Sequence, residues 1–266
     1  MAGTRPPQPG DFAPLGDAEA QKIRESILCA LAAEPERFLA AYADRFGNVL
    51  NADDAATLFD GYNQDRARYR VAVHPAATWI RDELFRRALA STVLKPAARV
   101  VFTAGGNAVG KTTALEFSRA RQFAHVVFDS TFSSPAHARS LVDRVLATGW
   151  PITIMHVDRP LDATLLAMLD RARTEGRLVR IEQIIHSHRG AAETVRSLWN
   201  EFQIDPAFDF HFLFNGSNST TEVSIEDTNP QDYTEIRKKL YDVLESEYRA
   251  GRITRPVRDG VRGLGK

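Results

Sequence analysis

Apolar residues recur at helical spacing through the first part of the chain. Between Ile23 and Phe46 they stand three or four positions apart, which predicts helices over about the first 45 residues. A further helix is expected after Asn51-Ala52-Asp53-Asp54, because Asp and Asn are good helix caps. Another is expected to begin at Pro75 and to run to about Leu94. The N-terminal part is therefore predicted to be helical.

From Arg99 the pattern changes to short apolar runs that alternate with helical stretches. This alternation is typical of βαβ units around a parallel sheet, so the predicted fold class is α/β, with three layers, a mostly parallel central sheet and an N-terminal helical segment. Strands are expected at Arg99–Thr103, Ala124–Phe128, Pro151–Val157, Phe208–Phe214 and Thr221–Ile225. Helices are expected at Lys111–Arg121, Pro135–Thr148, Pro160–Arg173, Ile181–Phe202 and Asp232–Tyr248.

Composition changes along the chain predict four segments. Residues 1–16 are rich in proline and glycine and are expected to form a disordered leader. Residues 17–95 form the helical segment and residues 96–250 the α/β core, with 17–250 expected as one compact domain. Residues 251–266 form a basic tail, which is either a solvated end or an arm that contacts phosphate.

Charge and cysteine usage exclude several classes of protein. With 34 Lys and Arg against 34 Asp and Glu, the net charge is zero, which argues against a long nucleic-acid track. Cys29 is the only cysteine, so no intramolecular disulfide and no thiolate zinc site can form. No apolar run approaches the ~18 residues that a membrane span needs. We expect a cytoplasmic protein without a membrane segment, and delivery into another cell stays open.

A phosphate-binding motif follows the first strand of the α/β part. The run Gly105-Gly106-Asn107-Ala108-Val109-Gly110-Lys111-Thr112 matches G-x-x-x-x-G-K-[ST] between a predicted strand and a predicted helix. The glycines let backbone N–H groups point at a phosphate, and Lys111 is expected to bridge the β- and γ-phosphates of ATP. The Thr112 hydroxyl is expected to complete a Mg²⁺ shell, and Thr113 to pack or cap beside it.

The surroundings of this loop favour a kinase that acts on a small substrate. A base-reading N-K-x-D, as GTPases have, is absent from the sequence. The strand that ends at Phe128 is followed by the single acid Asp129, whereas a motor ATPase has paired acids there. Transfer to a hydroxyl needs a base near the acceptor and cations over the transferred phosphoryl group.

Four segments together resemble the zeta toxins and the related phage polynucleotide kinases. They are Asn51-Ala52-Asp53-Asp54, the helix from His74, Phe128-Asp129-Ser130-Thr131 and Glu175-Gly176-Arg177-Leu178-Val179. The resemblance runs from about Asn48 to Asn218 and implies a phosphate-loop kinase fold. Two features depart from the family pattern. The base-bearing segment precedes the phosphate loop by about fifty residues instead of following it, and Arg180 stands where the lid has proline.

The resemblance assigns acidic residues to the acceptor side. Asp53 corresponds to the general base and Asp54 to its substrate-side neighbour, while capping of a helix by either residue is the alternative. Glu83 corresponds to an acid that holds substrate, or is an exposed helix charge. Asp129 contacts Mg²⁺ or substrate, serves as the base itself, or caps the turn that follows with Ser130.

Arginines near Gly176 correspond to the family's lid. Arg171, Arg173 and Arg177 lie within seven residues, and we expect Arg173 and Arg177 to clamp the transferred phosphoryl group. A solvated helix end is the alternative. Further along, one of His186 and His188 is expected to pack under the lid, because residues two apart do not share a helix face.

For the ends of two strands, the sequence leaves open whether they belong to the site or form an ordinary turn or loop. Asp158-Arg159-Pro160 is either the edge of the site or a turn. The segment from Phe214 to Asn218 resembles the turn that flanks adenine in the family, or is an ordinary loop.

By resemblance, the acceptor is a sugar hydroxyl of a nucleotide-linked compound such as a UDP-N-acetylhexosamine. A dinucleotide or a polynucleotide 5′-hydroxyl is the alternative within the kinase class. An ATPase or nucleotide switch that acts on a protein partner is the alternative from another class. The expected cofactors are ATP and Mg²⁺, and an antitoxin protein is a candidate partner.

Overall fold

The computed structural model describes residues 4–91, 98–176, 178–216, 219–228 and 232–263. The chain divides into two compact units, one of residues 1–96 with 125–128 and the other of residues 97–124 with 129–266. Its strands form a six-stranded, mostly parallel sheet in the order β1-β3-β2-β4-β5-β6. The predicted α/β class is confirmed.

The first unit is helical, as predicted. After the short 3-10 helix η1 (Pro9–Asp11), its helices are α1 (Ala18–Ala33), α2 (Pro35–Phe46), α3 (Ala52–Ala56), α4 (Asp60–Gln64) and α5 (Arg66–Leu89). α1 and α3 pack on α5. The main chain at Thr4 and Ala13 contacts these helices, since Arg24 donates to the Ala13 carbonyl at 2.7 Å and Trp79 Nε1 to the Thr4 carbonyl at 3.2 Å.

Pro75 lies inside α5, so the prediction that a helix begins there was wrong. The helix begins at Arg66, where Asp65 caps it by accepting a hydrogen bond from the Arg68 N–H. Pro75 has no N–H for the Val71 carbonyl, one turn earlier. Val71 is 61 % exposed, so water can take the place of the missing donor. A proline on the solvent side of a long helix thus gives the same local signal as a proline at a helix start.

Residues 49 and 50 form a strand that the sequence did not predict. β1 (Val49–Leu50) pairs in parallel with Val127 and Phe128 of β3 (Ala124–Asp129). Two residues are too few for an alternating pattern to register.

The second unit carries the rest of the sheet. Its strands are β2 (Arg99–Ala104), β4 (Ile152–Asp158), β5 (Phe208–Asn215) and β6 (Thr220–Glu222). β2, β4 and β5 are parallel, with Val100 opposite Ile152 and Ile152 opposite Phe208, and β6 is antiparallel to β5. The predicted strands are confirmed to within a residue or so, but the last is shorter than expected because Ile225 begins the 3-10 helix η2 (Ile225–Asp227).

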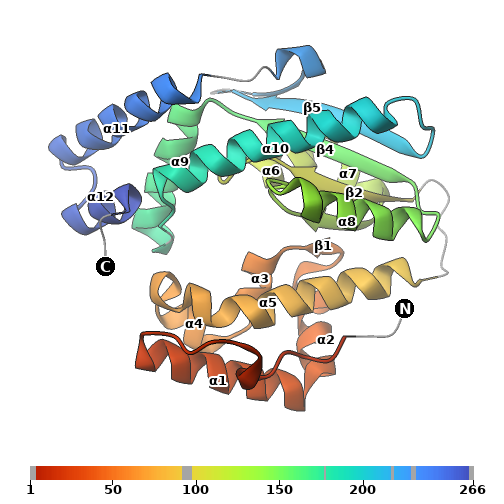
Figure 1. Cartoon of the computed structure of the whole chain (residues 1–266), viewed down its shortest axis with the longest axis horizontal. Coiled ribbons are helices and arrows are strands. Elements are labelled where there is room, and N and C mark those ends of the chain that lie inside the picture. Colours follow the sequence, from red (N-terminus) through yellow and green to blue (C-terminus); the bar gives the residue numbers. More distant parts are fainter. Residues whose placement is uncertain (1–3, 92–97, 177, 217–218, 229–231, 264–266) are drawn as a thin grey trace. The chain divides into compact units, whose positions relative to one another are not determined.

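Helices cover both faces of this part of the sheet (Figure 1). On one face lie α8 (Pro135–Leu146) and α10 (Ile181–Phe202), and the Trp199 ring of α10 packs edge-on against Phe210 and Phe212. On the other face lie α6 (Lys111–Phe117) and α7 (Ala120–Phe123), where Ser118 donates to Met155 Sδ. The predicted single helix 111–121 is therefore two helices, separated at Arg119, whose φ of 54° interrupts the helical backbone.

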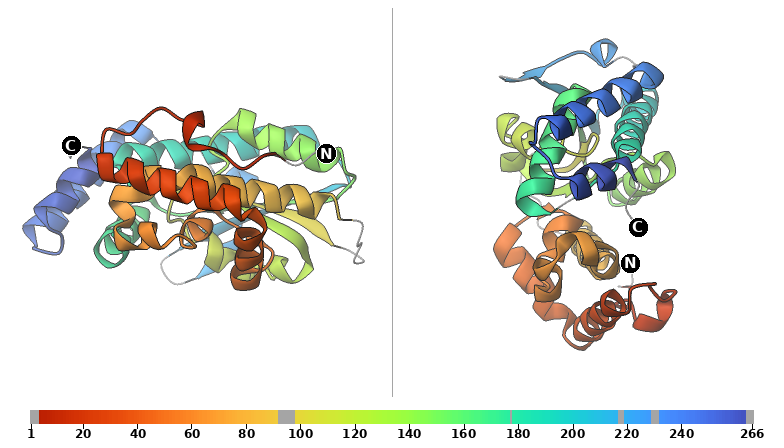
Figure 2. Two further views of the ribbon diagram at one scale, coloured as in Figure 1. Left: turned by 90° about the horizontal axis from the view of Figure 1, so that it is seen from below. Right: turned by 90° about the vertical axis from the view of Figure 1, so that its left-hand side faces the viewer.

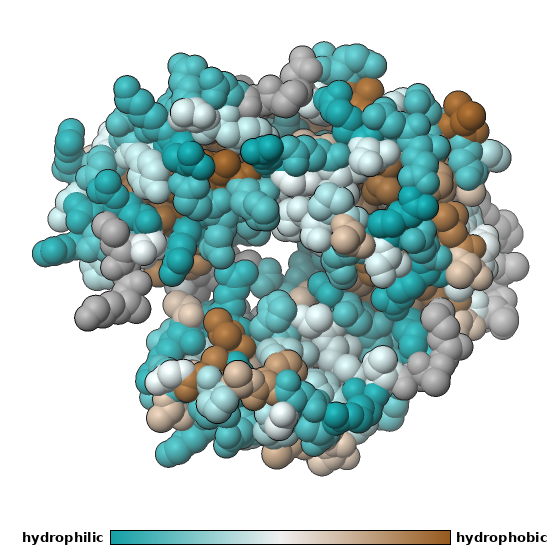
Figure 3. Space-filling view, viewed as in Figure 1, coloured by the Kyte–Doolittle hydropathy of each residue, from teal (hydrophilic) through white to brown (hydrophobic). Residues whose placement is uncertain are grey.

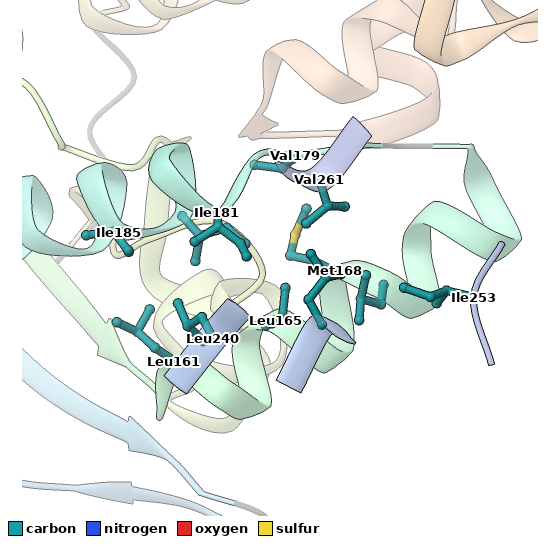
Figure 4. Packing of buried hydrophobic residues seen from close by; sticks show 12 residues of the cluster. Leu161, Leu165, Met168, Val179, Ile181, Ile185, Leu240, Ile253 and Val261 are labelled. Atoms are coloured by element: carbon teal, nitrogen blue, oxygen red, sulfur yellow. The ribbon is translucent and has the colours of Figure 1, made fainter. Parts of the chain in front are cut away.

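Three more helices close one end of the second unit, and α11 and α12 lie beside α9 (Figures 1 and 2). They are α9 (Leu161–Glu175), α11 (Tyr233–Arg249) and α12 (Arg255–Arg262). An apolar cluster joins them to α10 (Figure 4). It consists of Leu161, Leu165, Met168, Leu169, Val179, Ile181, Ile184, Ile185, Leu240, Leu244, Ile253 and Val261.

Within the basic tail, residues 255–262 form a packed helix. Val261 of α12 is 1 % exposed, and Arg262 pairs with Glu245 of α11 at 2.7 Å. In Figure 3 hydrophilic residues predominate on the surface over α11, which agrees with the exposed Arg237, Lys238 and Lys239 there. Within the described ranges, none of the helices has both the length and the apolar character that crossing a membrane requires.

Candidate phosphate-binding site

The phosphate loop joins β2 to α6, so the strand and the helix that the motif requires are both present. Gly105 has a φ of +140°, and a Cβ there would overlap the Val157 carbonyl oxygen. Gly110 has a φ of +88°, and a Cβ there would overlap Asn215 Nδ2. Both positions therefore need glycine for conformation and for space.

Lys111 begins α6 and lies back over the loop. Its Nζ is 3.4 Å from the carbonyl oxygens of Gly105 and Gly106 and 4.0 Å from Asp129 Oδ1. The side chain is 14 % exposed. Thr112 and Thr113 follow in the first turn and are exposed. An ammonium group that rests on two carbonyls can exchange them for phosphate oxygens.

Asp129 ends β3 and is the carboxylate that the structure places beside Lys111. Its side chain is 14 % exposed and accepts a hydrogen bond from the Thr103 hydroxyl of β2. The turn that follows is held by Ser130, whose hydroxyl accepts from the Phe132 N–H at 3.3 Å. Asp129 thus contacts both the phosphate loop, through Lys111, and the neighbouring strand, through Thr103.

The loop after β3 contains a feature that sequence reasoning missed. Phe132 has a φ of 55°, is 1 % exposed and packs against Phe102 with ring centroids 5.2 Å apart. One residue earlier, the Thr131 carbonyl accepts a hydrogen bond from the Gly105 N–H at 3.1 Å. A bulky residue in the left-handed region costs conformational energy and is often found at functional sites. Here it fixes the segment on which the phosphate loop rests.

Contacts from other elements hold the middle of the loop. Arg159 Nη1 donates to the Ala108 carbonyl at 3.2 Å, so the end of β4 forms an edge of the site. Asn215, at the end of β5, donates through Nδ2 to the Val109 carbonyl at 2.9 Å. Residues 217 and 218 of the expected adenine-flanking turn lie outside the described residues.

The lid arginines occupy the last turn of α9 and the link after it. Arg171 and Arg173 are both exposed, and Arg173 pairs with Asp170 at 2.5 Å. Gly176 ends α9 with a φ of +68°. Val179, 4 % exposed, then anchors the chain in the apolar cluster. Arg177 lies outside the described residues. The structure brings neither Arg171 nor Arg173 to the loop among the contacts it describes.

Asp53 and Asp54 belong to the first unit, at the start of α3. Asn51 caps this helix by accepting the Asp53 N–H at 2.7 Å. The alternative that Asp53 or Asp54 is the helix cap was therefore wrong, since both lie in the first helical turn. Both side chains are half-buried.

Glu83, also in the first unit, is not an exposed helix charge. It is 4 % exposed and pairs with Arg86 at 2.6 Å and with Arg87 at 2.9 Å. The hydrogen bond from Arg86 holds the pKa of Glu83 below its ordinary value. Arg87 also pairs with Glu36 of α2 at 2.5 Å. Buried pairing of this kind accounts for Glu83 within the first unit's own structure.

Comparison with known proteins supports the resemblance. Residues 121–209, about a third of the chain, match the sequence model of the zeta toxin family. This match confirms the resemblance to zeta toxins predicted from the sequence, together with the kinase class that it implies. We find no match among curated protein sequences.

Solved structures of AvrRxo1-ORF1 in complex with AvrRxo1-ORF2 are similar to this chain. The complex with sulfate ions has 15 % identity and a TM-score of 0.41, over 68 % of this chain and 80 % of that one. The complex with ATP has 14 % identity and a TM-score of 0.40, over 58 % and 66 %.

Proposed function

We propose that the protein transfers the γ-phosphate of ATP to a hydroxyl of a nucleotide-linked small molecule such as UDP-N-acetylglucosamine. The observation that carries this proposal is the placement of Lys111 and Asp129, a cation and a carboxylate 4.0 Å apart at one phosphate loop. The choice of acceptor rests on the resemblance to zeta toxins. The proposed partners are ATP, this acceptor and an antitoxin protein, and the proposed place of action is the cytoplasm of the producing or of a recipient cell.

ATP is bound through its phosphates. The backbone N–H groups from Gly106 to Lys111 and the N-terminus of α6 supply hydrogen bonds and partial positive charge. Lys111 Nζ leaves the carbonyls of Gly105 and Gly106 and binds the β- and γ-phosphates. Thr113 lies in the same turn of α6 and belongs to the proposed ATP-binding segment.

The oxygen donors at the loop fit Mg²⁺. Thr112 offers a hydroxyl, and Mg²⁺ favours oxygen ligands and is commonly held by one or two protein groups together with substrate phosphates. Among the described residues there is no group of three His, Cys, Asp or Glu able to hold a metal. When bound, Mg²⁺ would neutralise charge on the phosphates.

Asp129 is the proposed general base. Its carboxylate takes the proton of the acceptor hydroxyl, and the acceptor oxygen forms a bond to the γ-phosphorus. The bond between that phosphorus and the β–γ bridging oxygen breaks, and ADP leaves with the electron pair. Thr103 orients Asp129 from the neighbouring strand. Asp53 and Asp54, together with Glu83, remain candidates for the acceptor side.

The lid arginines stabilise the charge on the transferred group. Arg173 and Arg177 are proposed to contact phosphoryl oxygens, with Arg171 on the substrate side. Gly176 ends α9 after Arg173, and Val179, three residues further on, is buried in the apolar cluster.

Transfer from γ-labelled ATP tests the proposal. The protein is incubated with UDP-N-acetylglucosamine, with a dinucleotide and with an oligonucleotide that has a 5′-hydroxyl, in separate reactions. We expect label in the UDP-sugar, and its loss in Lys111→Met. Label in one of the other acceptors would change the assigned substrate but would still support the kinase proposal. Label found only as free phosphate, stimulated by a protein partner, would contradict the kinase proposal in favour of an ATPase or switch.

A further inference from the structure

A buried group of polar side chains lies behind the phosphate loop, and the proposed reaction does not use it. His188 of α10 is 5 % exposed, and its Nε2 is 2.7 Å from Oδ1 of Asp158 at the end of β4. Its other ring nitrogen, Nδ1, is 3.4 Å from the hydroxyl of Tyr233, the first residue of α11. His156, two residues before Asp158 on β4, is buried beside them. Three elements of the second unit thus meet at one imidazole.

The main chain at His188 supports the start of the phosphate loop. A Cβ on Gly106 would lie 3.1 Å from His188 Cα and 3.2 Å from its Cβ, so the two backbones are in close contact. The preceding residue, Ser187, accepts hydrogen bonds through Oγ from the Asn107 N–H at 3.3 Å and from Asn107 Nδ2 at 3.1 Å. α10 therefore lies directly against Gly106 and Asn107.

The partner of His188 supports the next residue of the loop. Asp158 Oδ1 accepts the Arg159 N–H at 2.7 Å, and Arg159 in turn donates to the Ala108 carbonyl. Three consecutive loop residues therefore rest on groups that are joined through the contact between His188 and Asp158.

Buried hydrogen bonds add to apolar packing in setting the position of α10 along the sheet. Contacts between aliphatic side chains tolerate small sliding movements, whereas a buried hydrogen bond has one favourable geometry. Burial by itself would raise the pKa of Asp158, but the hydrogen bond from His188 and the nearby imidazoles hold that pKa below its ordinary value. The carboxylate stays ionised and keeps an acceptor for His188.

We propose that His188 is a positioning residue of the phosphate loop, which it holds by fixing α10 and Ser187 against Asp158 and Tyr233. The inference rests on the proposed function, because ATP is the ligand whose binding reports the geometry of the loop. A distorted loop presents its N–H groups poorly to phosphate. The loss therefore falls on nucleotide affinity, which distinguishes His188 from a residue that touches the reacting atoms.

The test measures ATP binding by calorimetry in the full-length protein. His188→Gln keeps an N–H donor for Asp158, whereas His188→Phe keeps the size of the ring but has no donor. We expect the Kd for ATP to rise about tenfold or more in His188→Phe and to be largely restored in His188→Gln. His186→Gln is the matched control, since His186 lies on the same helix and is exposed. Its affinity should equal that of the wild type.

Further variants guard against a general loss of folding. Ser187→Ala removes the contacts with Asn107 together with a hydrogen bond from Ser187 Oγ to the Ile184 carbonyl within α10, and we expect a rise of a few-fold in Kd with little change in thermal unfolding. Equal affinities of His188→Phe and the wild type would overturn the inference, as would equal losses in the Phe and Gln variants. If the wild type and Lys111→Met both fail to bind ATP, the proposed function itself fails. If wild type binds and Lys111→Met does not, while the His188 variants bind normally, only this inference fails.

Discussion

Lys111 Nζ and Asp129 Oδ1 lie 4.0 Å apart, with the ammonium group also 3.4 Å from two carbonyls of the phosphate loop. The two residues come from different elements, the start of α6 and the end of β3. This places the ammonium group that we propose to bind phosphate next to the carboxylate that we propose to take a proton. The arrangement is what transfer of a phosphoryl group to a hydroxyl requires.

Replacing Lys111 should abolish most of the transfer activity. In Lys111→Met the charge is lost while much of the aliphatic stem remains, so the fold is retained and only the electrostatic contact with phosphate disappears. We expect kcat to fall by about 10²–10³-fold. Lys238→Met, at an exposed position of α11, is the control and should keep wild-type activity. Similar rates for both variants would contradict the role of Lys111.

Gly110→Ala should lose activity beyond its cost in stability. Gly149 offers a matched comparison, because its φ of +74° is close to the +88° of Gly110 but nothing lies within 4 Å of a Cβ there. Both alanine variants should lose about 1–2 kcal/mol of unfolding free energy from the unfavourable backbone angle. Only Gly110→Ala also displaces Asn215 and the loop. Denaturant unfolding and transfer rates measured on both variants separate the two effects, and equal activities would speak against this account of the loop.

Arg173→Ala should lower kcat with little effect on stability. Arg173 is exposed and paired only with Asp170 on its own helix among the contacts described, and exposed ion pairs contribute little. If it clamps the transferred group, kcat should fall by about 10²-fold or more. Arg139→Ala, which breaks exposed pairs with Asp143 of α8 and Glu201 of α10, is the control. A kcat for Arg173→Ala within twofold of the wild type would remove Arg173 from the lid.

Stability should fall in mild acid because of His156. Burial lowers the pKa of this imidazole from 6.5 to about 4, and Nδ1 has no hydrogen-bond partner among the described residues. Between these values the unfolded chain binds a proton that the folded protein does not, so the unfolding free energy decreases as pH falls from about 6.5 to 4. The loss should approach roughly 2–3 kcal/mol. Asp158, whose pKa is also lowered, contributes its own loss only below about 3.8.

Urea unfolding across this pH range measures the effect. His156→Leu removes this titrating group and should reduce the slope of the curve between pH 6.5 and 4, while other groups, such as His74, whose pKa burial also lowers, keep their own contribution. An unaltered slope in His156→Leu would show that another group is responsible.

Local patterns predicted the second unit well, because its strands and helices are long enough for their periodicity to register. The phosphate loop was equally clear, since its glycines are required by φ angles and close contacts that few other residues satisfy. Pro75 led to the wrong prediction of a helix start, because α5 tolerates a missing hydrogen bond where its backbone faces solvent. The burial of Glu83 was not predicted for a different reason. Its partners Arg86 and Arg87 are visible in the sequence, but whether Glu83 is buried depends on tertiary packing.

Of the groups that support the loop, the sequence singled out Asp158-Arg159-Pro160 as an edge of the site or a turn, but it did not predict the others. Phe132 adopts a positive φ although it is neither glycine nor asparagine, so its residue type did not predict this backbone conformation. His188 and Asp158 are thirty positions apart, and Ser187 carries no motif. Such contacts arise only when folding brings the end of β4 and the N-terminal half of α10 to the same loop.

The most direct test of the central claim compares Asp129→Asn with Asp53→Asn in single-turnover transfer from γ-labelled ATP. Both changes keep the size of the side chain and remove its basicity. We expect Asp129→Asn to slow transfer by about 10²–10⁴-fold with ATP binding retained, and Asp53→Asn to have a smaller effect that falls on the acceptor KM. A wild-type rate in Asp129→Asn, with the large loss in Asp53→Asn, would contradict the account and assign the base to the N-terminal unit.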